Sequence, residues 1–373
     1  MINRQEKLPG VHAMRGYAAL LVVFCHAADA INRYTNTSSF KWLLEGGFVG
    51  VCFFFVLSGF IMSYIHGADE KNRTTGKVFA LKRVTRVVPI YWITTLLIFG
   101  ALQFNSEFGA ETHHSFKGLI QSLFFVPMFD GPILRVGWTL VHEMLFYLIF
   151  AISFYLVKKP KTIFFIWMVC IVSFGLKQNP AITDLSAESS QLALLLPVLL
   201  SPLNLLFLMG LITTSPRARS LFYGITEVRY LRSILLSLLV LMALMWYLEK
   251  TYLLFSGSSI SWIRPVLYGI LSMGILIVAA EQRVGQSFSN RFHKLFGDAS
   301  YSIYLIHYYA ITVAALLMTK LRLMPLVHPV MQLLILIIVG ICSGIVFHYL
   351  LEKPLTICIS RKMKMNPSRK SVS

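Results

Sequence analysis

The stretch LPGVHAMRGYAALLVVFCHAADA, residues 8–30, carries an arginine and a histidine inside an otherwise apolar segment. Arg15 and His26 are eleven residues apart, so on an α-helix their side chains point in nearly the same direction. A rise of about 1.5 Å per residue separates them by roughly 16 Å along the axis. The spacing predicts one polar helix face, with a fixed cation near one end and a titratable base about half a bilayer deeper.

Two interpretations of this polar face are open from the spacing alone. Ionisable side chains within membrane helices are costly and usually face a bundle interior or an aqueous cavity, which favours a functional site. The structural interpretation is that Arg15 extends to the lipid headgroups while His26 is a hydrogen-bonded interior histidine.

Composition places the chain among membrane proteins. Hydrophobic residues make up 56% of its 373 residues and charged residues 13%, with a mean hydropathy of +0.69. Soluble domains carry about twice this charged fraction, so we predict an all-α polytopic bundle. An apolar patch at 120–128 is too short to span and is expected to be re-entrant or interfacial. The predicted spans are ten windows: 11–30, 47–66, 88–106, 138–157, 162–178, 191–212, 230–248, 262–280, 299–319 and 329–351.

Basic residues are distributed unevenly between the predicted loops. The termini and the even-numbered connections hold 24 of the 34 Lys and Arg, which predicts that both termini are cytoplasmic. This bias accounts for the net charge of +18 without a nucleic-acid partner. We expect a membrane domain over residues 1–356 and a basic, disordered cytoplasmic tail over 357–373. No cleavable signal sequence is predicted.

Two arginines precede the third predicted span. Arg83 and Arg86 are spaced i, i+3 on the predicted cytoplasmic side. Arg86 lies three residues before Pro89. Guanidinium groups on one helix face can bind phosphate oxygens in pairs. The general enrichment of arginine at cytoplasmic membrane edges would place them here as well.

The fourth predicted span contains a carboxylate, Glu143. Tyr147 follows one turn later on the same face, and Trp138 precedes it at the start of the span. A carboxylate that orients a histidine is the minimum arrangement for a general base, so we expect Glu143 to assist His26. The alternative is a structural hydrogen bond that locks two helices together.

The ninth predicted span carries a second polar stripe. Ser300, Tyr304 and His307 follow an i, i+4, i+7 pattern on one helix face. In the second span, the small pair Ser58-Gly59 permits close helix packing or opens the backbone to a ligand. The five cysteines form no CxxC pair, so neither a disulfide framework nor a metal site is predicted. Three tyrosines of the ninth span are expected to be anchors at the membrane interface: Tyr301, Tyr308 and Tyr309.

Six segments in this order resemble the acyltransferase-3 family of membrane acyltransferases. The resemblance covers Leu8 to about Pro354 and is closest to bacterial O-acetyltransferases that act on exopolysaccharide or O-antigen. The segments are Arg15 to His26, FFFVLSGF at 53–60, Arg83 to Trp92, WTLVHEMLFY at 138–147, GDASYSIYLIH at 297–307, and Glu352-Lys-Pro354.

The resemblance implies transfer of an acyl group, usually acetyl from acetyl-CoA as co-substrate, to a hydroxyl of a cell-surface polysaccharide such as exopolysaccharide, O-antigen or capsule. It makes His26 the catalytic histidine, either as general base or as the carrier of an acyl intermediate, with Arg15 as its basic partner. Arg83 and Arg86 match the basic motif linked to the donor. No permanently bound cofactor is implied, and the expected location is the bacterial inner membrane.

The remaining partners follow from the same resemblance. They are a glycan or lipid-linked glycan acceptor and membrane lipid, and a homo-oligomer stays open. The rival interpretation is a transporter or flippase for a lipid-linked glycan, which buried ionisable residues suit equally well, although no internal repeat is visible. The sequence names neither the acceptor sugar, nor the acyl group, nor the side on which the acceptor is modified. Candidates for binding the acceptor or stabilising an oxyanion are Ser58, Trp138, Tyr147, Ser300, Tyr304 and His307.

Overall fold

The fold is all-helical in the part of the chain that the computed structural model describes. The described residues contain helices and no β-strand, which confirms the predicted class. They are residues 8–35, 40, 46–66, 73–104, 114–128, 130–155, 160–176, 191–214, 231–252, 263–281 and 291–364.

Eight helical segments are long and apolar enough to cross a membrane. Six of them are α1 (Pro9–Thr35), α3 (Gly46–His66), α4 (Arg73–Phe104), α6 (Trp138–Ser153) with the preceding turn η2 (Arg135–Gly137), α13 (Ile263–Glu281) and α14 (Arg291–Lys320). Another is built from two helices, α9 (Gln191–Leu199) and α10 (Leu203–Thr213), on either side of Pro202. The last is α15 (Pro329–Phe347), which passes through a π-helical turn, η3 (His348–Glu352), into α16 (Lys353–Lys364).

The other two predicted spans form helices with shorter apolar cores. α7 (Pro160–Leu176) and α12 (Leu231–Tyr252) occupy the windows 162–178 and 230–248. Eight and ten are both even counts, so either one predicts that the termini share a side of the membrane. α5 (Phe116–Leu123) is too short to span, as expected for the patch at 120–128.

The segment expected to be a disordered tail is helical in its first part. α16 continues to Lys364, and residues 365–373 lie outside the described residues. Because α16 carries basic side chains and follows the last apolar helix directly, the basic end of the chain begins as a rigid extension of the bundle.

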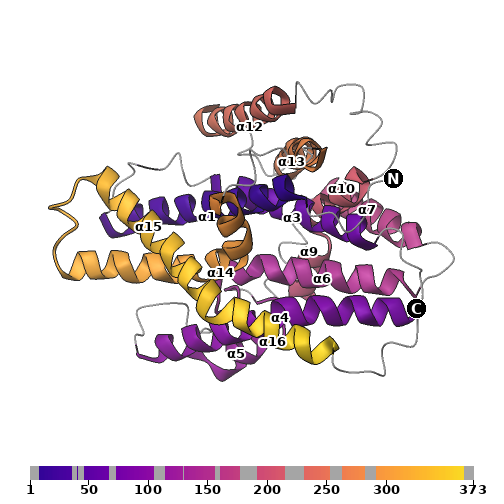
Figure 1. Cartoon of the computed structure of the whole chain (residues 1–373), viewed down its shortest axis with the longest axis horizontal. Helices are drawn as coiled ribbons and strands as arrows, with labels where there is room; N and C mark the ends of the chain where they lie inside the picture. Colours follow the sequence, from indigo (N-terminus) through magenta and orange to yellow (C-terminus); the bar gives the residue numbers. More distant parts are fainter. Residues whose placement is uncertain are drawn as a thin grey trace.

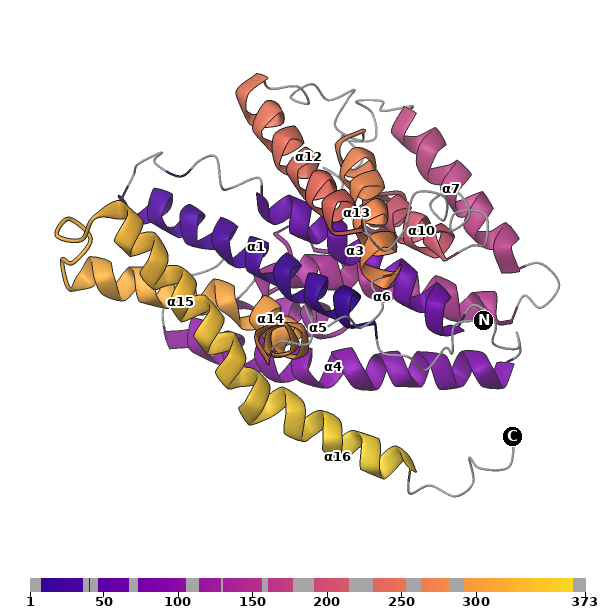
Figure 2. The same cartoon turned by 45° about the horizontal axis from the view of Figure 1, so that its top comes forward.

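α1 lies at the centre of the bundle, against α3, α14 and α15. Figures 1 and 2 show α12 and α13 on one side of it and α4 and α16 on the other. The α14–α15 connection and the C-terminal end of α1 lie at the same end of the molecule, on the left in both views. Gly16 contacts Phe296 while Arg33 reaches Tyr308, so α1 and α14 run parallel.

Small residues allow α1 and α14 to pack closely. A Cβ atom on Gly16 would lie 2.8 Å from the backbone carbon of Phe296, and one on Gly297 would overlap the ring of His12. Real Cβ atoms do not approach neighbours so closely, so only glycine fits at these two positions. The close approach brings side chains of the two helices within hydrogen-bonding distance along their length.

The contact between α3 and α10 depends on a second glycine pair. A Cβ on Gly59 would overlap the carbonyl of Phe207, and one on Gly210 would overlap the carbonyl of Val56. This is the small-residue packing that joins membrane helices, and it explains the glycine of the Ser58-Gly59 pair.

We predict that Gly59→Ala lowers the thermal unfolding temperature of the purified protein in detergent, because overpacking at a tight contact costs about 1–3 kcal/mol. The matched control is Gly100→Ala on α4, where a Cβ would meet nothing within 4 Å. Alanine favours a helix over glycine by about 1 kcal/mol, so this control should leave the temperature unchanged or raise it. Equal thermal unfolding temperatures of the two variants would contradict the close backbone contact at Gly59.

Candidate active site

A cavity opens between α1, α3, α4, α6 and α14. The enclosed part of the cavity measures about 100 Å³, and it opens into a wider space at its mouth. Its charged lining residues are Arg15, Arg83, Arg86 and Glu143. The site therefore brings together four side chains that the sequence had placed on three different helices. Hydroxyl groups complete its polar lining: Ser58, Thr139, Tyr147, Ser300, Tyr301 and Tyr304.

Glu143 is held in the cavity by two hydroxyl donors. Ser58 on α3 donates to its Oε1 at 3.0 Å, and Tyr147, one turn along α6, donates to the same oxygen at 2.5 Å. Among the described residues, no ion pair joins this carboxylate to an arginine within 4.0 Å. Glu143 is thus fixed in orientation while its second oxygen, Oε2, is left for a ligand or water.

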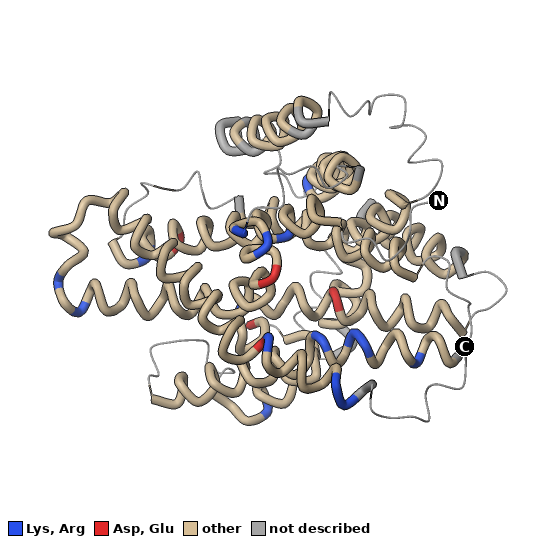
Figure 3. Tube along the Cα trace, in the orientation of Figure 1, with Lys and Arg blue, Asp and Glu red and all other residues tan. Residues whose placement is uncertain are grey.

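The arginines give the cavity a positive charge. Arg83 is 8% exposed, with its guanidinium 5.6 and 5.8 Å from the rings of Phe79 and Tyr147. Arg86 lies on the exposed face of α4, and its charge acts on that of Arg15 across the cavity. Figure 3 shows Lys and Arg gathered along this part of α4 and at the end of α16. With three cations and one carboxylate, the cavity lining has a net positive charge, which favours binding of an anionic ligand.

His26 pairs with His307 on α14. Its Nδ1 lies 2.9 Å from Nε2 of His307 and 3.1 Å from the carbonyl of Val22. Nδ1 of His307 lies 2.8 Å from the carbonyl of Ile303, which can only accept, so that nitrogen carries a proton. In the neutral ring, Nε2 of His307 is then an acceptor, and His26 donates to it through Nδ1.

This assignment leaves Nε2 of His26 with a free lone pair. No described residue forms a hydrogen bond to that nitrogen. The ring is further fixed by the edge of Tyr308, at 5.2 Å between ring centroids and an interplanar angle of 87°. A neutral imidazole held by its Nδ1–H, with Nε2 unprotonated, is ready to accept a proton or to attack as a nucleophile.

The expected pairing of Glu143 with His26 is not observed. Glu143 lies in the cavity and bonds Ser58 and Tyr147, whereas the His26 ring bonds His307 and does not line the cavity. The reason is that α1 packs against α14 more closely than against α6. The residue that orients the His26 ring is a second histidine, His307, instead of a carboxylate.

An aromatic wall, formed by Phe54 and Tyr304, lines the cavity on the side where Tyr304 also lies next to His307. Both side chains line the cavity, with their rings 5.6 Å apart. The Tyr304 ring lies 6.1 Å from that of His307, and its hydroxyl is 2.7 Å from that of Thr139. Tyr304 therefore borders both the cavity that contains Glu143 and the His26–His307 pair.

The remaining predicted candidates divide between the cavity and its surroundings. Ser300 lines the cavity and donates to the carbonyl of Gly297 at 2.8 Å. Trp138 is 37% exposed at the start of α6, packs edge-on against His142, and does not reach the cavity. Its position fits a side chain at the membrane boundary better than a ligand contact.

The tyrosines expected to anchor at the membrane interface are instead inside the bundle. Tyr301 lines the cavity and donates to the carbonyl of Val87 at 2.9 Å. Tyr308 contacts His26, and Tyr309 donates to the carbonyl of Ile133. Their i, i+7 and i+8 spacing matches the stripe that already contained Ser300 and His307, and this spacing could have indicated burial.

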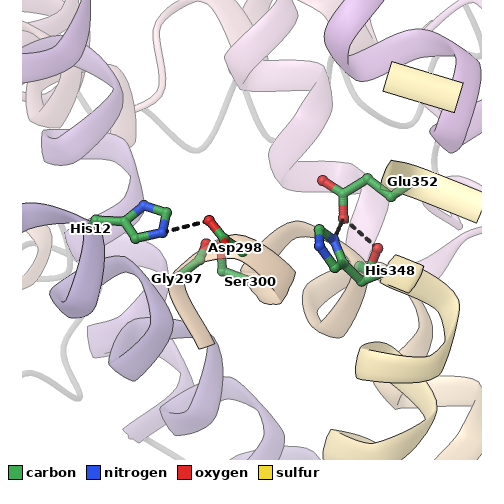
Figure 4. A network of polar contacts seen from close by, with 7 residues as sticks. His12, Gly297, Asp298, Ser300, His348 and Glu352 are labelled. Carbon is green, nitrogen blue, oxygen red and sulfur yellow. Dashed lines mark hydrogen bonds and ion pairs between the residues drawn. The ribbon is translucent and has the colours of Figure 1, made fainter. Parts of the chain in front are cut away.

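A polar network missed by the sequence analysis surrounds the start of α14 (Figure 4). His12 on α1 lies 3.0 Å from Asp298. Glu352, in the π-helical turn η3, accepts from Ser302 at 2.5 Å and lies 2.8 Å from Nδ1 of His348. Together with Glu143, Glu352 places negative charge near Arg15. The i, i+4 spacing of His348 and Glu352 was the available sequence signal.

Comparisons with known proteins identify relatives. A family model described as an acyltransferase domain matches residues 8–349. The exopolysaccharide production protein ExoZ of Rhizobium meliloti is 35% identical over 34% of this chain and 38% of its own length. The acyltransferase MdmB of Streptomyces mycarofaciens is 27% identical over 52% of this chain and 51% of its own.

A Staphylococcus aureus protein named as a candidate O-acetyltransferase is 24% identical over 83% of this chain and 52% of its own length. The chain therefore spans about half, or less, of the length of these curated relatives. No solved structure matches the chain.

Removing one donor from Glu143 should destabilise the bundle. Tyr147→Phe leaves Ser58 as the single described donor to Glu143, and losing a hydrogen bond to a charged group costs about 1.5–3 kcal/mol. We expect a lower thermal unfolding temperature in detergent. Tyr155→Phe is the control, because Tyr155 is 40% exposed and its hydroxyl has no hydrogen-bond partner among the described residues. An equal effect of both substitutions would rule out the Tyr147–Glu143 bond as a stabilising contact.

Proposed function

Because the chain belongs to the acyltransferase family whose model covers residues 8–349, we propose that this multi-pass membrane enzyme is an O-acetyltransferase of a cell-surface polysaccharide in the bacterial inner membrane. The names of its relatives support this proposed function: one is an exopolysaccharide production protein, and another is named as a candidate O-acetyltransferase. The family match favours an enzyme over the transporter or flippase considered from sequence alone.

Acetyl-CoA is the proposed donor. Its nucleotide end carries several phosphate charges, which Arg83 and Arg86 suit through paired guanidinium contacts. The cavity continues from these arginines past Glu143 to Tyr304, and its walls are otherwise mostly apolar. A pantetheine arm lying along it carries the thioester toward the bundle centre. The positive-inside distribution supports the proposal that this end of the bundle is cytoplasmic.

The proposed base is His26, and the observation that carries this proposal is its free Nε2. A sugar hydroxyl gives its proton to this nitrogen while its oxygen attacks the thioester carbonyl. The carbon–sulfur bond then breaks, and the departing thiolate takes the proton from His26, leaving an ester and free coenzyme A. His307 positions the ring by accepting from Nδ1–H, as a carboxylate does in hydrolase triads.

An acyl-His26 intermediate would use the same nitrogen. In that route Nε2 attacks the thioester carbonyl and the C–S bond breaks, which expels the coenzyme A thiolate. The sugar hydroxyl then attacks the acyl-imidazole, the acyl–nitrogen bond breaks to restore His26, and the hydroxyl proton goes to the thiolate. Both routes require the acyl end to pass the aromatic wall, because Tyr304 borders both the cavity and the histidine pair. Tyr304 and Thr139 are the proposed donors to the developing oxyanion, for which a hydroxyl must exchange its present bond to the carbonyl of Val136.

His26→Ala is expected to reduce acetyl transfer at least 100-fold, since general base catalysis contributes about 10²–10⁴ in rate. Two measurements test the loss of acetyl transfer. One is the release of free thiol from acetyl-CoA by the purified protein, and the other is the acetyl content of the cell's surface glycan by mass spectrometry. His328→Asn, which keeps a helix-capping side chain at the start of α15, is the control and should behave as wild type. Full activity of His26→Ala would remove His26 from the mechanism.

Arg86→Gln should raise the KM for acetyl-CoA about tenfold, with a smaller change in kcat, because a charge-assisted phosphate contact is lost. Lys82→Gln removes an equally exposed charge from the same helix, but Lys82 does not line the cavity. Its KM should stay within about twofold of wild type. Similar KM values for the two variants would mean that only general surface charge, and not the cavity, attracts the donor.

A further inference from the structure

A second cationic site lies at the opposite end of α1 from Arg15. Arg33 and Arg135 both place their guanidinium groups near the ring of Tyr308, at 5.7 and 5.4 Å from its centroid. The same ring packs against His26 at 5.2 Å. One aromatic ring therefore separates these two cations from the proposed base.

The two arginines differ in how their charge is compensated. Arg33 forms an ion pair with Asp29 at 2.8 Å and donates to the hydroxyl of Tyr308 at 3.2 Å. The guanidinium of Arg135 has no carboxylate and no hydrogen-bond acceptor among the described residues. The group formed by Asp29, Arg33 and Arg135 thus has an excess of one positive charge.

The position of Arg135 is fixed by its surroundings. Its backbone N–H donates to the hydroxyl of Tyr309 at 3.2 Å, and that hydroxyl also donates to the carbonyl of Ile133. The backbone is thereby pinned to α14, while the guanidinium lies over Tyr308 and remains exposed. A cation held in place without a counterion is pre-organised for an anion.

The membrane topology does not explain this charge. Only nine of the 34 Lys and Arg fall on this side of the predicted bundle, so the positive-inside bias acts against basic residues here. The cavity with Arg83 and Arg86 is lined by Arg15 of α1, whereas Arg33 lies near the C-terminal end of the same helix. The proposed donor site and this second site therefore lie toward opposite ends of α1 from His26.

We propose that Arg135, supported by Tyr308 and Arg33, binds an anionic group of the acceptor and places a neighbouring hydroxyl at Nε2 of His26. This inference rests on the proposed acetyl transfer and adds the class of acceptor: a sugar with an oxyanion close to the modified hydroxyl. The oxyanion is either the carboxylate of an acidic sugar or the phosphate that links a sugar to a lipid. Guanidinium groups bind both through the same paired geometry.

The test measures probe binding to the purified protein in detergent by calorimetry. Saturating coenzyme A first occupies the donor arginines. Two probe pairs differ in charge: methyl glucuronide with methyl glucoside, and geranyl diphosphate with geraniol. Wild type should bind the anionic member of at least one pair about tenfold or more tightly than the neutral one.

Arg135→Gln should abolish that preference, whereas Lys320→Gln, which removes an exposed charge at the end of α14, should keep it. Preference within the sugar pair identifies an acidic sugar, and preference within the prenyl pair identifies a lipid-linked phosphate. Equal binding within both pairs, or a preference that survives Arg135→Gln, overturns the proposal. Thioester consumption is measured separately, so an anion preference without acetyl transfer would reject the proposed function and retain the anion site.

Discussion

The hydrogen bond between His26 and His307 depends on how closely α1 and α14 approach, and much of the site depends on that bond. Gly16 and Gly297 remove the side chains that would hold the helices apart. Because the helices are parallel, the contact extends from His12–Asp298 at one end to Arg33–Tyr308 at the other. A single helix pair thus sets the orientation of the base and the spacing of both cationic ends.

The polar groups of the bundle are organised along α1. Near Arg15, cations from α1 and α4 surround Glu143, and Glu352 adds negative charge from the last helix. His26 follows at mid-depth, and Asp29 with Arg33 completes the series. Charged groups in a membrane are tolerated where they face one another or a cavity, and here Arg15 and Glu143 line the cavity while Arg33 pairs with Asp29. The proposed reaction joins two polar reactants at the level of His26.

Local sequence patterns predicted the helices and the polar face of α1, because hydropathy and helical period are properties of neighbouring residues. The same reasoning placed Tyr147 beside Glu143 and grouped Ser300 with Tyr304. Long-range partners were beyond it: Ser58 lies 85 residues from Glu143, and His307 lies 281 from His26. No local sequence pattern predicts that α14, and not α6, packs closest to α1. Tyr308 was misassigned for the same reason, since a tyrosine near a span end looks identical whether it faces lipid or protein.

The aromatic wall also bears on the electrical integrity of the membrane. A protein that admitted a polyanion from one face and a sugar from the other would short-circuit the proton gradient if its two polar compartments were continuous. In the proposed reaction, the rings of Phe54 and Tyr304, 5.6 Å apart, lie between the donor cavity and the proposed acceptor site, and the Tyr304 hydroxyl is engaged by Thr139. Moving an ion through such a partition costs several kcal/mol of lost hydration. If the proposed donor and acceptor arrive from opposite faces, these rings keep the two polar reactants from being joined by a continuous ion pathway.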